Sequence, residues 1–146
     1  MNIKKQIVVV DIDGTIAKVG DRLKYLKLKP PDYDSFYLSC FDDEPIKDMI
    51  DFVKNLYPVY DIVFCTGRRE QVREVTAKWL FNQGLYGALL MRPDGDMRHD
   101  VLTKPEALFD YLDKSEVAFI LEDRNSMVKK WRELGLRCLQ VDYGNF

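Results

Sequence analysis

A short run of β-branched residues that ends in two carboxylates most constrains what this chain can fold into. Residues 7–10 read Ile-Val-Val-Val, the pattern of a strand buried on both faces of a parallel sheet. The run leads into Asp11 and Asp13, followed by Gly14 and Thr15. Open α/β sheets place their sites at the carboxyl ends of such strands. Because two carboxylates this close repel each other, the pattern predicts a bound cation or a shared proton. An ordinary Asp- and Gly-containing turn is the alternative interpretation.

The rest of the chain alternates strand-like and helix-like segments. Apolar runs typical of strands occupy residues 7–10, 59–65, 87–91, 117–121 and 136–141. Segments with helical spacing of apolar residues occupy 45–57, 70–83, 103–112 and 125–134, and a capping box at 103–106 is expected to start the third helix. This order predicts an α/β fold, a three-layer Rossmann-like arrangement around a five-stranded, mainly parallel sheet.

Length and composition bound the class of protein. A chain of 146 residues, 47 % hydrophobic and 32 % charged, is sufficient for one domain with its own core. Residues 18–44 interrupt the alternation of strands and helices and are too few for an independent domain. We therefore expect a single domain over residues 1–146, in which residues 18–44 form a flap or short hairpin over the site.

Charge and cysteine content restrict the surroundings in which the protein works. The formal net charge of −2 provides no overall attraction to nucleic acid or anionic membranes, so a phosphate-rich partner has to be bound by local charge. No apolar run approaches the roughly 20 residues of a membrane span, and we expect no signal peptide. The 3 scattered cysteines suggest reduced thiols and a cytoplasmic location.

Polar residues also follow the second and fourth predicted strands. Thr66-Gly67-Arg68 is expected to open a helix, where the helix dipole, free amides and the Arg68 guanidinium would bind a phosphate. A Thr-Gly turn that only caps the helix is the alternative. Glu122-Asp123 forms a second acidic pair after the fourth strand. Two acidic pairs on adjacent strand ends predict a cation site, and ligands that are all oxygen favour Mg²⁺.

The polar loop after the third strand leads to Lys104. A lysine at the start of a helix lies against the positive end of the helix dipole, which is unfavourable unless an anion is near. We therefore expect Lys104 to face an anion, with a solvated surface lysine as the alternative. Asp100 lies four residues earlier and is expected to orient it. The sequence contains no phosphate-binding loop for a nucleoside triphosphate.

These motifs together resemble those of a known enzyme superfamily. Asp11-Ile12-Asp13-Gly14-Thr15, Thr66-Gly67-Arg68, Lys104 and Glu122-Asp123 resemble, in order and spacing, the four motifs of the haloacid dehalogenase-like (HAD) phosphohydrolases. The resemblance covers nearly the whole chain. It implies that Asp11 is a nucleophile and Asp13 an acid/base. It also implies that Mg²⁺ is held by Asp11, Asp13 and the Glu122-Asp123 pair, and that Thr66 and Lys104 complete the catalytic set.

A narrower resemblance is to the phosphatase domain of phage-type polynucleotide kinase/3′-phosphatases. It extends outside the four motifs, over Arg22, residues 98–100 and much of residues 123–146. It implies removal of 3′-phosphates, including cyclic ones, from DNA or RNA ends. The residues expected to bind the substrate are Arg22, Gly67, Arg68, Arg98 and Asp100. One departure is Glu122, where that domain typically has Asp. The resemblance includes the phosphatase domain but no kinase domain, so separate kinase and ligase partners are expected.

Three functional hypotheses remain open at this point. A flap of this size leaves the expected site open, which suits a bulky substrate such as a polynucleotide end. A general nucleotide or small-metabolite phosphatase is the second hypothesis. The third is a non-catalytic HAD-fold module that recruits other proteins. The filled catalytic positions favour an enzyme over this last hypothesis.

Overall fold

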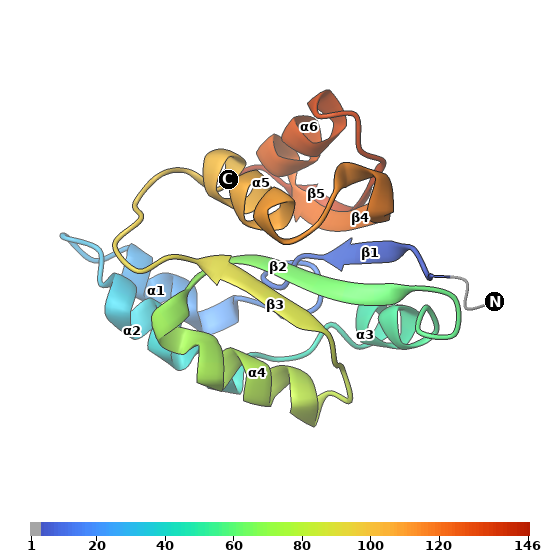
Figure 1. Cartoon of the computed structure of the whole chain (residues 1–146). Helices are drawn as coiled ribbons and strands as arrows, with labels where there is room; N and C mark the ends of the chain where they lie inside the picture. The colour runs from blue at the N-terminus through green and yellow to red at the C-terminus, as the bar shows by residue number, and fades with distance from the viewer. Residues whose placement is uncertain (1–3) are drawn as a thin grey trace.

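A parallel sheet organises residues 4–146, the part of the chain that the computed structural model describes (Figure 1). The strands are β1 (Ile7–Val10), β2 (Asp61–Arg69), β3 (Ala88–Arg92), β4 (Val117–Arg124) and β5 (Cys138–Gly144). Their order is β3-β2-β1-β4-β5, and every neighbouring pair runs parallel. The predicted α/β fold with a five-stranded sheet is confirmed. The first three residues of the expected domain lie outside the described residues.

Helices cover both faces of the sheet, which gives the three layers (Figure 1). The helices on the sheet are α3 (Lys47–Lys54), α4 (Arg73–Asn82), α5 (Asp100–Tyr111) and α6 (Asn125–Glu133). One apolar core lies beneath α3 and α4, and the other lies beneath α5 and α6. None of the helices in the described part of the chain has the length and apolarity that a membrane crossing requires.

The position of β1 explains its run of β-branched residues. Val8 and Val10 belong to the core beneath α3 and α4, whereas Ile7 and Val9 belong to the core beneath α5 and α6. Successive side chains of a strand point to opposite faces, so a strand covered on both sides needs an apolar residue at every position. The sequence pattern therefore identified the central strand.

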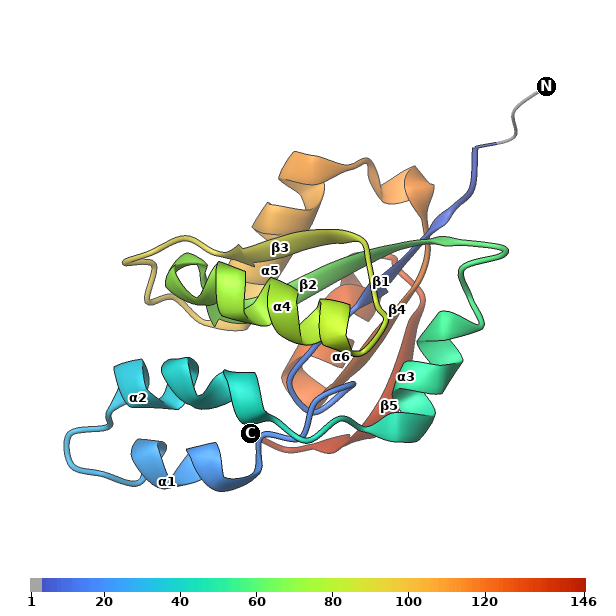
Figure 2. The ribbon, with the colours of Figure 1, turned by 90° about the horizontal axis from the view of Figure 1, so that it is seen from below.

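The segment expected to form a flap or short hairpin is helical. It contains the 3₁₀ turn Gly20–Arg22, α1 (Leu23–Leu26), α2 (Tyr33–Leu38) and a second 3₁₀ turn, Ser39–Asp42. The Asp32 side chain caps α2 by accepting a hydrogen bond from the Ser35 amide at 3.0 Å. Seen from below, α1 and α2 lie side by side and project beyond the sheet (Figure 2). We refer to residues 18–44 as the helical arm.

The Thr66-Gly67-Arg68 motif does not open a helix, and this prediction was wrong. β2 continues through the motif to Arg69, which pairs with Arg92 of β3 after a shift of register. A 3₁₀ turn, Glu70–Val72, then precedes α4. Continued pairing with β3 thus keeps the motif extended. A helix dipole cannot act at this position.

The helix that carries Lys104 begins earlier than the sequence suggested. His99 has extended backbone, and its Nδ1 atom accepts a hydrogen bond from the Val101 amide at 3.2 Å, so α5 begins at Asp100. The prediction of a capping box at Thr103–Glu106 is therefore wrong. Lys104 lies more than one turn inside the helix, away from the free amides of its first turn.

Candidate active site

The carboxyl ends of β1, β2 and β4 meet at one cleft of about 780 Å³. β1 lies between β2 and β4, so the chain changes direction across the sheet at this strand. Such switch points are where open α/β sheets bind ligands. The helical arm and the last residues of the chain form other parts of the cleft wall.

An acidic cluster occupies one side of the cleft floor. Asp11, Glu122 and Asp123 are buried, and each has a ligand atom within 4.8 Å of those of the other two. The Lys104 ammonium donates to Asp11 Oδ1 at 2.7 Å and to Glu122 Oε2 at 3.0 Å. Thr15 Oγ1 donates to Asp11 Oδ2 at 2.9 Å. One ammonium therefore faces three carboxylates.

The surplus negative charge contributes to raised pKa values of two carboxyl groups in the cluster. Burial, and then the neighbouring Glu122 carboxylate, raise the pKa of Asp11 to about 7. Burial, and then Asp11, raise the pKa of Asp123 to about 7. A hard divalent cation among these oxygens would remove the repulsion, so the donor set fits Mg²⁺. The Asp13 carboxylate is not one of the three groups of this cluster.

A second group of charges surrounds Asp13. Asp13 Oδ1 accepts hydrogen bonds from Arg68 at 2.7 Å and Arg22 at 2.9 Å, and Asp13 Oδ2 accepts from Arg68 Nε at 3.1 Å. Asp43 accepts from Arg22 Nε and Arg68 at 2.7 and 2.9 Å. Burial by itself would raise the pKa of Asp13, but Arg68 and then Arg22 outweigh it and lower the pKa to about 2.

The two arginines are buried and form hydrogen bonds with groups of the same chain. Arg22 is 3 % exposed and Arg68 is 0 % exposed. Arg22 also donates to the Phe36 carbonyl, and Arg68 donates to Thr76. The geometry thus places them around Asp13, where the sequence prediction had expected both to bind substrate phosphates.

Asp43 was not identified from the sequence. It belongs to an acidic stretch, Asp42-Asp43-Glu44, that looks like solvated surface. Its backbone carbonyl accepts a hydrogen bond from the Trp79 indole at 2.9 Å, which fixes the end of the helical arm against α4. The signal in the sequence is weak, because its partners lie 21 and 25 residues away.

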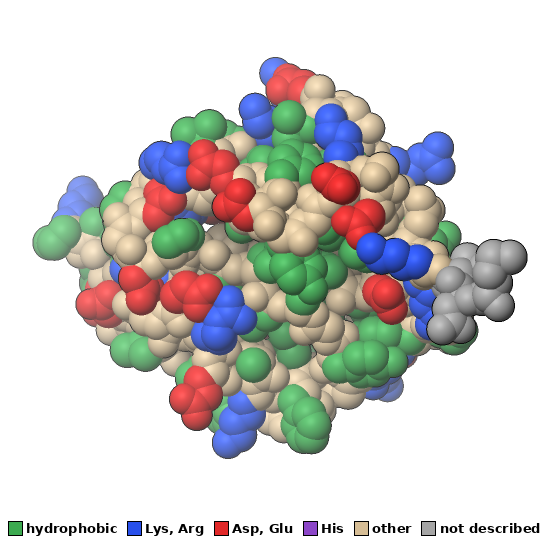
Figure 3. Space-filling model, in the orientation of Figure 1, with side chains coloured by type: hydrophobic (Ala, Val, Ile, Leu, Met, Phe, Trp, Pro, Cys, Tyr) green, Lys and Arg blue, Asp and Glu red, His purple; other side chains and the backbone are tan. Residues whose placement is uncertain are grey.

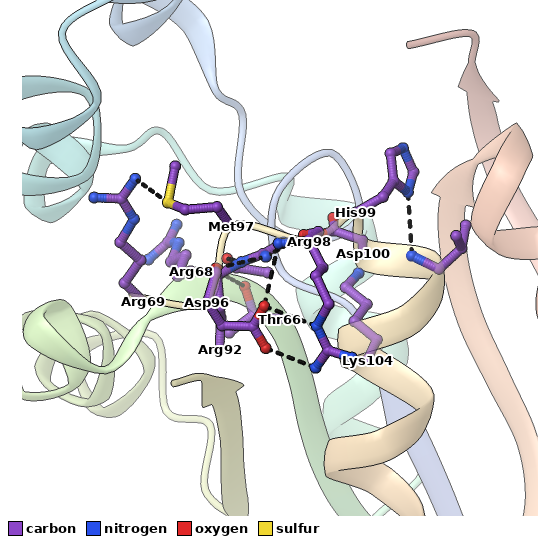
Figure 4. A network of polar contacts seen from close by, with 12 residues as sticks. Thr66, Arg68, Arg69, Arg92, Asp96, Met97, Arg98, His99, Asp100 and Lys104 are labelled. Atoms are coloured by element: carbon purple, nitrogen blue, oxygen red, sulfur yellow. Dashed lines mark hydrogen bonds and ion pairs between the residues drawn. The ribbon is translucent and has the colours of Figure 1, made fainter. Parts of the chain in front are cut away.

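Asp100 lies near Lys104 but bonds to other groups. Its carboxylate pairs with Arg92 and accepts from Arg124 at 2.8 Å, whereas the Lys104 bonds go to Asp11 and Glu122. The expected direct contact between Asp100 and Lys104 is absent from the hydrogen bonds of residues 4–146. Figure 4 shows Arg92 reaching across from β3 to Asp100 at the start of α5. Sequence reasoning missed Arg92 and Arg124.

Two glycines permit the close approach of these carboxylates. Gly14 has φ of +85°, and a Cβ atom there would lie 2.1 Å from Asp123 Oδ2. A Cβ atom on Gly67 would lie 2.6 Å from Asp100 Oδ1. A side chain at either position would displace an acidic residue of the site.

The remaining predicted residues, Thr66 and Arg98, lie in different parts of the structure. Thr66 is buried and lines the cleft, and its hydroxyl accepts from the Arg68 amide at 3.2 Å. Arg98 lies on the loop before α5 and donates to Asp96 at 2.8 Å and Glu106 at 2.6 Å. Arg98 does not line the cleft. Of the predicted substrate-binding residues, Gly67 and Asp100 line the cleft, whereas Arg22, Arg68 and Arg98 do not.

Comparison with known proteins places the geometry among phosphatases. The family model that describes the polynucleotide kinase PNKP phosphatase domain matches residues 5–146. A chain from the Pnkp1/Rnl/Hen1 complex is 29 % identical with a TM-score of 0.83, over 99 % of this chain and 49 % of that one. A chain from the Pnkp1/Rnl/Hen1 RNA repair complex is 30 % identical with a TM-score of 0.83, over 97 % of this chain and 44 % of that one.

The shared part is a portion of those longer proteins. This chain spans about half the length of the two chains from the repair complex. A haloacid dehalogenase-like hydrolase from Streptococcus pneumoniae is 16 % identical with a TM-score of 0.67, over 93 % of this chain and 84 % of that one. At that identity the likeness shows a common fold.

Proposed function

This chain belongs to the family of PNKP phosphatase domains within the HAD fold, and we propose that it is a Mg²⁺-dependent phosphomonoesterase that removes 3′-phosphates from nucleic-acid ends. Family membership supports a phosphatase acting on nucleic-acid ends. The observation that carries the proposal is the division of the site. Asp11 lies in a cluster with surplus negative charge, while Asp13, two residues away, lies between two arginines.

Asp11 is the proposed nucleophile. One of its carboxylate oxygens would attack phosphorus, forming an aspartyl-phosphate as the bond to the 3′ oxygen breaks. Lys104 and Thr15 fix the orientation of its side chain. Lys104, Thr66 and the amides near Gly67 would hold the phosphoryl oxygens. When bound by Asp11, Asp123, Glu122 and the Asp13 carbonyl, Mg²⁺ would supply positive charge that offsets the phosphoryl group.

Asp13 is the proposed acid/base. It would give a proton to the leaving 3′ oxygen and then take one from the water that hydrolyses the aspartyl-phosphate, which releases phosphate and restores Asp11. Its low pKa means that it has to leave the arginines before it can carry a proton. Asp43 keeps contact with both arginines, so part of their charge stays offset when Asp13 turns toward the substrate. In this proposal Arg22 and Arg68 are positioning residues for Asp13.

RNA ends are the first substrate to test, because two similar chains come from an RNA repair complex. We also propose that kinase and ligase activities act on the same ends from other proteins or domains. A general nucleotide phosphatase is the second candidate, since a cleft of about 780 Å³ would also accept a mononucleotide.

The test is phosphate release from matched RNA and DNA oligonucleotides with 3′-phosphates, with Mg²⁺ and with a chelator. The control substrates are a 3′-mononucleotide and a 5′-phosphorylated oligonucleotide, and the control protein carries Asp11→Asn. We expect Mg²⁺-dependent release from the 3′ ends. Equal kcat/KM for the oligonucleotide and the mononucleotide would contradict the polynucleotide assignment and favour the second candidate.

A further inference from the structure

The lysine and arginine side chains that line the cleft or lie beside Asp13 are already paired with carboxylates of the same chain. The pairs are Arg22 and Arg68 with Asp13 and Asp43, Lys104 with Asp11 and Glu122, Arg92 and Arg124 with Asp100, and Lys18 with Glu44. On the face shown in Figure 3, Lys and Arg side chains also lie among Asp and Glu side chains. A basic groove that follows a phosphate backbone is therefore not what the described residues offer.

The cleft wall instead carries aromatic side chains from two distant parts of the chain. Tyr33 and Tyr37 come from α2 in the helical arm, and Tyr143 and Phe146 come from β5 and the residues after it. Tyr33 is 42 % exposed and Tyr143 is 76 % exposed. Exposed apolar surface that surrounds a polar site marks a place where a ligand binds.

Three of these rings are held in place by cations. The Arg69 guanidinium lies over Tyr33 at 5.6 Å and over Tyr37 at 5.1 Å from the ring centroids. The Arg124 guanidinium lies over Phe146 at 4.8 Å. Such contacts restrict the rings before a ligand arrives, which lowers the entropy lost on binding.

We propose that Tyr33 and Tyr143, with Tyr37 and Phe146 beside them, are stacking surfaces for the nucleobases next to the phosphate that is removed. This inference rests on the proposed function and specifies how the end is recognised. Stacking requires only a flat π face, so any base is accepted, while an end that lacks its base should bind more weakly. The cleft volume lies within the roughly 300–1,000 Å³ of pockets that hold a ligand of this size.

The first experiment compares two 3′-phosphorylated oligonucleotides with the wild-type protein. One has all its bases, and in the other the two terminal sugars are replaced by tetrahydrofuran analogues without a base. We expect kcat/KM to fall by roughly 5- to 150-fold for the second substrate. Equal values would overturn the inference while leaving the proposed function intact. Hydrolysis of glycerol phosphate without release from either oligonucleotide would overturn the proposed function itself.

The second experiment assigns the effect to residues. Tyr33→Leu and Tyr143→Leu remove the ring but keep an apolar side chain. Each should reduce the ratio of kcat/KM for the substrate with all its bases to kcat/KM for the substrate without terminal bases. Tyr33→Phe and Tyr143→Phe keep the ring and should show the same kcat/KM ratio as the wild type. Phe81→Leu is the matched control, because Phe81 is 79 % exposed on α4 and lies outside the cleft. A full difference between the substrates in both Leu variants would overturn the inference.

Discussion

Asp11 and Asp13 lie two residues apart in the chain, but their carboxylates lie in opposite electrostatic surroundings. The side of the site around Asp11 has one lysine for three carboxylates, and the pKa of Asp11 is raised to about 7. The side around Asp13 has two arginines for two carboxylates, and the pKa of Asp13 is lowered to about 2. Only the first side has charge left over for a metal ion.

The difference follows from which strands and segments flank β1. On the Asp11 side, β4 and α5 contribute Glu122, Asp123 and Lys104. On the Asp13 side, β2 and the helical arm contribute the arginines. Residues two apart in a strand point to the same side, but β1 ends at Val10 and the chain turns at Gly14, whose φ is +85°. Outside regular strand geometry, a two-residue spacing can place two carboxylates in different surroundings, as the proposed division into nucleophile and acid/base requires. This division can be tested by changes confined to one side.

The largest effect is expected from Asp11→Asn, because an amide cannot form the aspartyl-phosphate. We expect kcat for release of 3′-phosphate to fall by roughly 10⁴-fold or more. The variant also loses one of three clustered negative charges, so its metal-free melting temperature should not fall. Near-normal hydrolysis would exclude the covalent mechanism.

Asp13→Asn should act differently on both activity and stability. Loss of acid/base catalysis lowers kcat by roughly 10²- to 10⁴-fold and leaves measurable turnover. The substitution leaves the arginines with one carboxylate, so the free energy of unfolding should fall by about 1–3 kcal/mol. Urea denaturation of this variant beside Asp11→Asn measures the contrast. A stability equal to that of the wild type would show that Asp13 is not needed to offset the arginines.

A smaller effect is expected from Arg68→Lys, which keeps the charge but removes the planar fork that contacts Asp13, Asp43 and Thr76. Misplacement of Asp13 should lower kcat by up to about 10²-fold. The concentration of Mg²⁺ that gives half-maximal activity should stay unchanged, since Arg68 lies on the other side of the site. A parallel rise in that concentration would show that the two sides are coupled.

The smallest effect is a dependence of metal-free stability on pH. Folded Asp11 and Asp123, with pKa values of about 7, hold protons that the unfolded chain has released above about pH 4. Their contribution to stability is therefore lost as the pH rises through about 7. The melting temperature should decline by a few degrees between about pH 5 and pH 8.

Two controls separate this decline from other titrations. Saturating Mg²⁺ should remove the decline, because an ion that binds only the folded state offsets the charges. Asp123→Asn should reduce the decline without Mg²⁺. Asp13 contributes in the opposite sense, since its stabilisation is lost only as the pH falls toward 2. A metal-free melting temperature that rises from about pH 5 to pH 8 would contradict the charge surplus around Asp11.

The sequence predicted the sheet because its signals are local. A run of β-branched residues marks β1, and helical spacing of apolar residues marks the layers. The positions of Asp11, Glu122, Asp123 and Lys104 at one end of the sheet follow from the order of strands and helices. The ends of elements were less well predicted, since β2 extends through Thr66 by pairing with β3.

The arrangement around Asp13 could not be predicted in the same way. Arg22 and Arg68 were identified, but a guanidinium suits a phosphate and a carboxylate equally well, so residue type alone does not name its partner. Asp43 and Arg124 act through contacts between segments far apart in the chain. Only the folded helical arm brings Asp43 to the arginines.

The central place of β1 has a consequence for when the proposed site is assembled. Asp11 bonds to Lys104, 93 residues later, and Thr15 contacts Asp123, 108 residues later. Contacts that close such long loops form slowly and late in folding. A nascent chain that has emerged from the ribosome only as far as β3 contains Asp11 but neither Lys104 nor the acidic pair Glu122 and Asp123. The proposed site is therefore complete only after α5 and β4 have docked beside β1.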